Sequence, residues 1–176
     1  DGGYTSPWEF EGGAERTVTI GGWSKGWAMT GWRLGWITAS ARVMDGVKKI
    51  NVSSATHVAT FLMPAAEIAL GLTEEIDIMN DSFRARRTVA HEAFSSLPGI
   101  VVPKPEGAFY ILCDVTGTGM TDMEFATKAL EEAAVQVIPG SLMQGGEGLI
   151  RVSYATSIEN IHEGVRRLRE WLENRA

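Results

Sequence analysis

The chain has 176 residues, 44% of them hydrophobic and 22% charged, a composition typical of a folded globular protein and unlike that of a disordered or collagen-like chain. Its 16 Lys and Arg against 22 Asp and Glu give a net charge of −6, which excludes the basic footprint of a protein that binds nucleic acid or an anionic membrane surface. A single cysteine, no zinc-ligand spacing, no apolar run of the ~18 residues that a membrane span needs, and no signal peptide predict a cytoplasmic protein without a metal, whose partners are small molecules.

The first fifty residues predict two strands and a helix. Thr17–Ile20 is short and β-branched, and the two glycines after it favour a strand that ends at a tight backbone feature. Gly35–Ala39 predicts a second strand, and Ala41–Ile50 places apolar and charged residues at helical spacing. We therefore expect a β-β-α order here.

Two further helices are predicted after this stretch. Ala65–Leu70 is expected to end a buried helix that Pro64 starts or kinks, and Gly71 is the residue that stops it. Thr73–Leu97 is the longest helical pattern in the chain, and Pro98 ends it. One face of this long helix carries the apolar residues Ile76, Met79, Phe83, Ala90, Phe94 and Leu97.

Three strands are expected in the last eighty residues. Ala108–Leu112 is an apolar run that follows two prolines. Val135–Ile138 and Leu149–Tyr154 are predicted to be joined by a turn at Gly145 and Gly146.

Two helices complete this β-α-β-β-α order. Thr121 and Glu124 match a capping box that opens a helix ending near Ala133. Thr156 and Glu159 predict the same device at the start of the last helix.

The segment after the first predicted strand has the strongest chemical signal. A Ser-Lys pair is most often an exposed lysine in a loop, and the spacing of a Walker A phosphate loop is absent. The sharper interpretation places Lys25 at a strand end among tryptophans, where a desolvated amine can form a Schiff base. Arg33, with Ser24 and glycine amides, is then a candidate for holding a phosphate.

These residues resemble a known family. Ser24–Gly35 is similar to the cofactor-lysine signature of the fold-type I pyridoxal-phosphate (PLP) aminotransferases of class I and II. Asp1 and Tyr4 resemble a motif that contacts the pyridine ring, and Pro105–Tyr110 resembles a strand at the substrate mouth. Gly148–Ala155 is similar to the segment that carries a carboxylate-binding arginine. The resemblance covers the whole chain.

The resemblance implies a role for each cofactor residue. Lys25 would hold PLP as a Schiff base and, once displaced by the substrate, move the proton as general base and acid. Ser24 and Arg33 would bind the phosphate. Asp1 would keep the ring nitrogen protonated, so that the ring accepts electrons from the substrate, and Tyr4 would contact the ring oxygen.

The resemblance also implies a substrate site. Arg151 would bind the substrate α-carboxylate through a bidentate pair, and Phe109 would form a wall of the substrate pocket. From the residues alone, an exposed strand arginine and a core aromatic are the alternatives. The other ionisable candidates lie in sequence contexts that indicate neither a catalytic base nor a metal ligand. They are His57, His91, His162 and Cys113.

The fold class that follows is α/β. Residues 1–72 are expected to form the end of a large PLP-binding domain with a mostly parallel sheet, residues 73–97 a connecting long helix, and residues 98–176 an α+β small domain. Family members are about twice as long, so we expect a C-terminal half, with the N-terminal half missing or supplied by a separate chain. A decayed relative is the remaining alternative.

The predicted function is PLP-dependent transamination between an α-amino acid and a 2-oxo acid, in a complete protein that is a homodimer. Two alternatives stay open. One is another PLP reaction on the same fold, such as that of a β-lyase or a synthase, because the same cofactor bond serves these reactions. The other is a truncated PLP-fold module that binds without catalysing.

Overall fold

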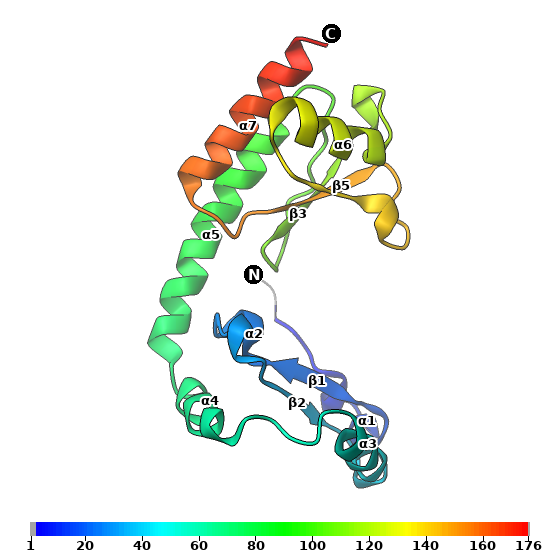
Figure 1. Cartoon of the computed structure of the whole chain (residues 1–176), viewed down its shortest axis with the longest axis vertical. Coiled ribbons are helices and arrows are strands. Elements are labelled where there is room, and N and C mark those ends of the chain that lie inside the picture. Colours follow the sequence, from blue (N-terminus) through cyan, green and yellow to red (C-terminus); the bar gives the residue numbers. More distant parts are fainter. Residues whose placement is uncertain (1–2, 176) are drawn as a thin grey trace. The chain divides into compact units, whose positions relative to one another are not determined.

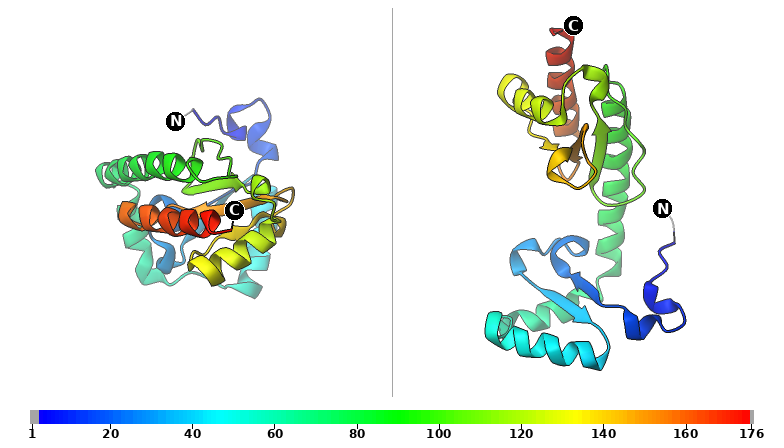
Figure 2. Two further views of the ribbon diagram at one scale, coloured as in Figure 1. Left: turned by 90° about the horizontal axis from the view of Figure 1, so that it is seen from above. Right: turned by 90° about the vertical axis from the view of Figure 1, so that its right-hand side faces the viewer.

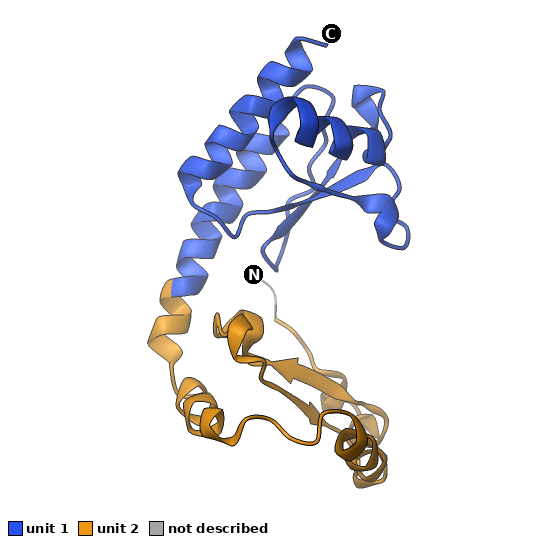
Figure 3. Cartoon of the chain, viewed as in Figure 1, with its two compact units in different colours: residues 1, 79–176 blue, residues 2–78 orange. Residues whose placement is uncertain are grey.

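The chain forms two compact units, which Figure 3 shows in different colours. The computed structural model describes residues 3–175 (Figure 1), so Asp1, predicted to contact the cofactor ring, lies outside the described residues. The N-terminal unit comprises the chain up to Ile78 and the C-terminal unit begins at Met79, a division that falls inside the long helix α5 (Thr73–Ser95). The expected domain boundaries at residues 72 and 97 remain a prediction.

The N-terminal unit contains a two-stranded antiparallel sheet of β1 (Thr19–Gly22) and β2 (Gly35–Thr38). Its helices are α1 (Gly13–Arg16), α2 (Trp23–Gly26), α3 (Ala41–Ser54) and α4 (Met63–Ala69). In the sheet, Ile20 lies opposite Ile37 and Gly21 opposite Trp36. Both predicted strands and the predicted helices are present, with bounds that differ from the expectation by a few residues.

The resemblance implied a mostly parallel sheet in this part of the chain. Within the described residues, every pairing between strands is antiparallel. The reason is local, because β1 and β2 are joined by one turn of α2 and a 3₁₀ turn, and these do not carry the chain back along the sheet as a parallel crossover requires.

The C-terminal unit places a three-stranded antiparallel sheet against helices. Its strands are β3 (Tyr110–Asp114), β4 (Ile138–Pro139) and β5 (Leu149–Ser153), in the spatial order β3-β5-β4. Helices α6 (Asp122–Ala133) and α7 (Ile158–Glu173) complete the unit together with α5. Figures 1 and 2 show α5 and α7 side by side, and an Arg169 guanidinium N–H donates to the Ser96 hydroxyl at 2.7 Å across them.

Apolar residues at helical spacing bury one face of each helix against the sheet. Phe125 of α6, Leu168 of α7 and Ile150 of β5 have no exposed surface, and they pack in one continuous core. Cys113 lies in the same core, where burial raises the pKa of its thiol to about 12. A thiol held neutral in this way is not a nucleophile at physiological pH, which agrees with a packing role.

The capping prediction is confirmed at α6 and wrong by one residue at α7. Thr121 and Glu124 form the reciprocal capping box that their spacing predicts. At α7 the N-cap is Ser157, whose hydroxyl accepts from the backbone N–H of Asn160 at 3.2 Å. The hydroxyl of Thr156 instead accepts from the Asn160 side chain. Because Thr156 and Ser157 are adjacent, the sequence alone does not tell which of the two hydroxyls caps the helix.

The strand predicted at Val135–Ile138 is shorter than expected. Ala134 takes a left-handed conformation with φ 53°, and the backbone N–H of Val135 donates to the carbonyl of Ala129. Val135 therefore closes the end of α6 and does not pair in the sheet. The pairing of β4 with β5 begins only at Ile138.

Asp122 ties this part of the unit together. Its carboxylate is 5% exposed and accepts from the backbone N–H groups of Ser141, at 2.7 Å, and Gly148, at 3.3 Å. The hydrogen bonds from Ser141, followed by that from Gly148, lower the pKa of the carboxyl. The start of α6 is thus fixed to the loop that leads into β5.

Candidate functional site

The predicted cofactor lysine lies in a short turn that its own backbone closes. Lys25 is the third residue of α2 and is exposed. The backbone N–H of Trp23 donates to the carbonyl of Leu34 at 3.3 Å, and the Thr30 hydroxyl donates to the carbonyl of Ser24 at 2.6 Å. Residues 22–34, called the lysine turn below, therefore leave β1 and return to β2 as one closed segment.

Arg33 lies at the end of the lysine turn in a left-handed conformation, with φ 56°. One guanidinium nitrogen donates to the carbonyl of Thr30 at 2.8 Å, which uses one of the five N–H donors of the group. A Cβ built on Gly26 or Gly31 would meet no atom within 4 Å, so both glycines border open space.

This set of side chains fits the group that the resemblance implies. PLP has an aldehyde, which an amine can bond, and a phosphate, which hydroxyl and guanidinium donors bind. Lys25, Ser24 and Arg33 supply these three groups from one turn. Tyr4, predicted to contact the ring oxygen, is 84% exposed and precedes the 3₁₀ turn Pro7–Glu9.

The predicted substrate residues meet in the C-terminal unit. Arg151 lies on β5, the middle strand, opposite Leu112 of β3. Its guanidinium carbon lies 4.7 Å from the centre of the Tyr110 ring, a cation–π contact that orients the group. The ring centre of Phe109 is 4.4 Å from that of Tyr110, so one cluster contains both predicted residues.

Sequence reasoning missed the residue that holds this cluster in place. Tyr154 is 1% exposed, its hydroxyl donates to the carbonyl of Ala108 at 2.7 Å, and its backbone N–H donates to the carbonyl of Phe109 at 3.0 Å. Ala108 has φ 60°, a conformation that costs energy for a residue with a side chain. Burial raises the pKa of the Tyr154 phenol, which stays a donor at neutral pH. A tyrosine three residues after Arg151 was the available signal.

The structure therefore brings together two separate groups of predicted residues. Ser24, Lys25 and Arg33 share the lysine turn of the N-terminal unit, and Phe109 and Arg151 share a cluster of the C-terminal unit. Each group lies within one unit, and Tyr4 lies outside both groups.

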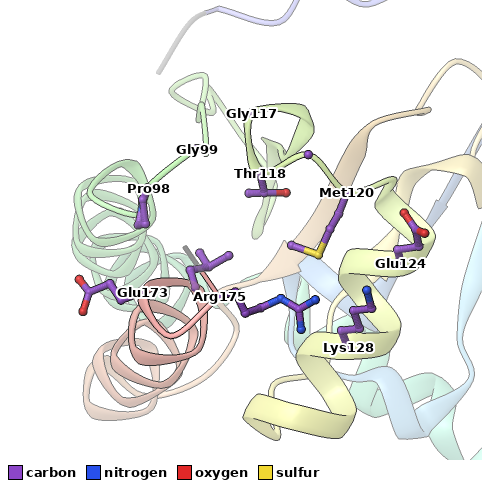
Figure 4. Close-up of a pocket in the computed structure, with 11 residues that line it drawn as sticks. Pro98, Gly99, Gly117, Thr118, Met120, Glu124, Lys128, Glu173 and Arg175 are labelled. Atoms are coloured by element: carbon purple, nitrogen blue, oxygen red, sulfur yellow. The ribbon is translucent and has the colours of Figure 1, made fainter.

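A cavity of about 540 Å³ in the C-terminal unit lies outside both groups (Figure 4). It is bordered by Gly117 and Met120, and by side chains of both charges. Glu124 accepts from Thr121, and Arg175 donates to Glu132. Among residues 3–175, none of the predicted site residues lines this cavity.

The remaining candidates have ordinary partners. His91 lies 3.1 Å from the carbonyl oxygen of Val102, and His57 contacts that of Val58 at 3.0 Å. Across residues 3–175, no group of three or more His, Cys, Asp or Glu side chains is arranged to hold a metal ion. None of the helices described is both long and apolar enough to cross a membrane.

Comparison with known proteins gives the family. The profile of "Aminotransferase class I and II" matches residues 2–168. The chain is 37% identical to the aspartate aminotransferase of Pyrococcus horikoshii over 163 residues, which are 90% of this chain and 42% of that protein. It is 36% identical to the aromatic-amino-acid aminotransferase 2 of Thermococcus litoralis, over 94% of this chain and 43% of that protein.

Solved structures agree with this result. The crystal structure of the aromatic aminotransferase from Pyrococcus horikoshii matches with a TM-score of 0.90 and 36% identity, covering 94% of this chain and 45% of that one. The aspartate aminotransferase from Rhizobium meliloti matches with a TM-score of 0.91 and 28% identity, over 97% of this chain and 45% of that one. The chain thus spans less than half the length of its relatives. It belongs to the family of class I and II aminotransferases.

Proposed function

We propose that this chain carries the cofactor lysine and the carboxylate-binding arginine of a PLP-dependent transaminase. The observation that carries the proposal is the lysine turn, a closed segment that contains Lys25, Ser24 and Arg33 and two glycines that border open space. The match to the family profile over residues 2–168 supports it.

Each residue has a stated task in this proposal. The amine of Lys25 bonds the cofactor and, when the substrate takes its place, holds or moves a proton at the substrate α-carbon. Ser24 and Arg33 bind the phosphate, and Tyr4 contacts the ring oxygen. Asp1 is proposed to pair with the ring nitrogen. When bound, PLP supplies an electron-accepting ring.

Substrate recognition is assigned to the C-terminal unit. The guanidinium of Arg151 binds the α-carboxylate in a bidentate pair, which selects α-amino acids and 2-oxo acids and fixes the bond that is to break. Phe109 forms a wall beside it. The cation–π contact with Tyr110 supports this role, because it restricts the arginine before the substrate arrives.

The setting of the reaction is proposed from the family and the composition. We infer a homodimer as the state of the complete protein, a cytoplasmic location, and a large-domain end followed by a small domain as the arrangement of this chain. A net charge of −6 and the absence of a basic footprint favour small-molecule partners over nucleic acid.

The first experiment locates the cofactor bond. The chain is incubated with PLP and reduced with borohydride, and the pyridoxyl adduct is mapped by peptide mass in the wild type, in Lys25→Ala, and in Lys104→Ala as a control for an exposed lysine. We expect an adduct at Lys25 that Lys25→Ala abolishes and that Lys104→Ala leaves unchanged. Label scattered over the surface lysines would contradict the assignment.

A second assay separates the reaction classes. The chain is supplied with PLP, an α-amino acid and a 2-oxo acid. Appearance of a new amino acid supports transamination, and Arg151→Ala should then reduce the rate by at least about a hundredfold, because a charge-assisted bidentate pair is lost. Release of ammonia or sulfide without a new amino acid would instead identify a lyase.

A further inference from the structure

Three tryptophans form a cluster, two of them in the lysine turn and the third in β2. The ring centres of Trp23 and Trp36 lie 4.8 Å apart at an interplanar angle of 74°, and Trp27 lies 6.1 Å from each of them. Edge-to-face rings at these distances attract one another beyond the area that they bury. The cluster is therefore a packed element of the N-terminal unit.

Two of these indoles also donate hydrogen bonds to α4, which lies about forty residues later in the chain. The Nε1–H of Trp23 donates to the carbonyl of Ala66 at 3.1 Å, and that of Trp27 donates to the carbonyl of Ala69 at 2.7 Å. Both acceptors belong to the last turn of α4, where helix carbonyls lack partners within the helix, and the carbonyl of Ala69 also accepts from the backbone N–H of Leu72 at 3.2 Å. The side chains of Ala66 and Ala69 are themselves buried, and their small size allows the rings to approach the helix.

Chain position and burial connect these bonds to the lysine. Trp23 is the first residue of α2 and Trp27 is the residue that follows its last one, so Lys25 lies between the two in the same turn. Both tryptophans are half-buried, whereas Lys25 is exposed. Fixing the two indoles therefore restrains the backbone that carries the lysine.

We propose that Trp23 and Trp27 are positioning residues for Lys25, and that their indole N–H groups hold the lysine turn against the carboxyl end of α4. This inference rests on the proposed function, because it assigns how the lysine of that site is held. If the tryptophans only filled space, their rings would be sufficient and the two indole hydrogen bonds would not matter. The donors are thus the feature to remove.

The test replaces Trp by Phe, which keeps an aromatic ring and removes the donor. Trp23→Phe/Trp27→Phe is compared with Trp32→Phe, a residue of the same turn that is 43% exposed. Hydrogen exchange of the peptide over residues 22–34 is measured in the whole chain without cofactor. We expect at least about tenfold faster exchange in the double variant, because each lost hydrogen bond favours the open state several-fold. Trp32→Phe should exchange as the wild type does.

Pyridoxyl labelling after borohydride gives the second measurement. We expect the share of label at Lys25, relative to the other four lysines, to fall several-fold in the double variant and to persist in Trp32→Phe. Where the double variant unfolds by circular dichroism, the single Trp27→Phe replaces it, because it removes the shorter of the two bonds.

The outcomes separate this inference from the proposed function. Exchange that is unchanged in the double variant, or raised equally in Trp32→Phe, overturns the positioning role. Label lost in the double variant without faster exchange also overturns it. Scattered label in the wild type contradicts the proposed function, and the exchange measurement still decides whether the two indoles hold the turn.

Discussion

The two units of this chain differ in where they keep their apolar residues. The C-terminal unit buries a continuous core that extends over three helices and the sheet. In the described part of the N-terminal unit, the buried apolar residues are Leu34, Ala66 and Ala69. Large apolar side chains are instead exposed there, among them Phe61 at 80%, Ile20 at 77% and Ile50 at 70%.

The buried core and the predicted cofactor lysine therefore lie in different units. The unit with the predicted cofactor lysine has almost no core of its own, whereas the unit with the predicted substrate arginine has a complete one. Exposed apolar surface of this kind is typical of a face that packs against further protein. We therefore expect the stability of the chain to come from residues 79–176.

The largest expected effect follows from dividing the chain. A fragment of residues 79–176 should unfold in one cooperative thermal transition, because its core is intact. A fragment of residues 1–78 should show no such transition by circular dichroism. A sharp transition in the shorter fragment would show that the two units do not differ in this way.

Two phenylalanines test the difference at single-residue level. Phe125→Ala should cost about 3–5 kcal/mol of unfolding free energy, because the ring has no exposed surface. Phe61→Ala, at a residue that is 80% exposed, should change it by no more than about 0.5 kcal/mol. Urea unfolding of the whole chain measures both values, and similar losses in the two variants would contradict the comparison.

Acid stability should depend on the C-terminal unit. The pKa of Asp122 is lowered in the folded state by the hydrogen bonds from Ser141 and Gly148, so its contribution is present above the unfolded-state pKa and is lost as pH falls through the lower folded-state pKa. Stability should fall below about pH 4, and Asp122→Asn should flatten that fall. The exposed Asp45→Asn is the matched control. Equal slopes for wild type and Asp122→Asn would refute this role.

The smallest effect concerns helix caps. Ser157→Ala should cost about 1 kcal/mol, because its hydroxyl caps α7. Ser40 precedes α3 but forms no capping hydrogen bond from its side chain, so Ser40→Ala should cost only a few tenths. Thr156→Ala should resemble Ser40→Ala. Thermal unfolding of the three variants ranks their losses of stability. A larger loss for Thr156→Ala than for Ser157→Ala would support the capping box predicted at Thr156 and Glu159.

The sequence was sufficient where one local signal acts without competition. The long helix from Thr73 and the capping box at Thr121 follow from spacing alone, and the structure confirms both. The cap of α7 was misjudged because two adjacent hydroxyls compete for it. The strand expected from Val135 failed because a left-handed residue before it turns the chain back onto its helix.

The candidate site shows the same limit. Lys25, Ser24 and Arg33 could be proposed because Ser24–Gly35 is similar to a specific family signature. The acceptors of the two indoles are backbone carbonyls about forty residues away, and a carbonyl has no signature in the sequence. The hydrogen bond from Tyr154 to the carbonyl of Ala108 escaped for the same reason.

The pairing of Gly21 with Trp36 has a consequence for sequence variation. The two residues lie opposite each other in β1 and β2, and a Cβ at Gly21 would lie 2.2 Å from the indole of Trp36. A side chain at position 21 would thus force the indole at position 36 to move. Homologous sequences should covary here: those with a bulky ring at the second position should keep glycine at the first, and those with a side chain at the first should carry a smaller residue at the second.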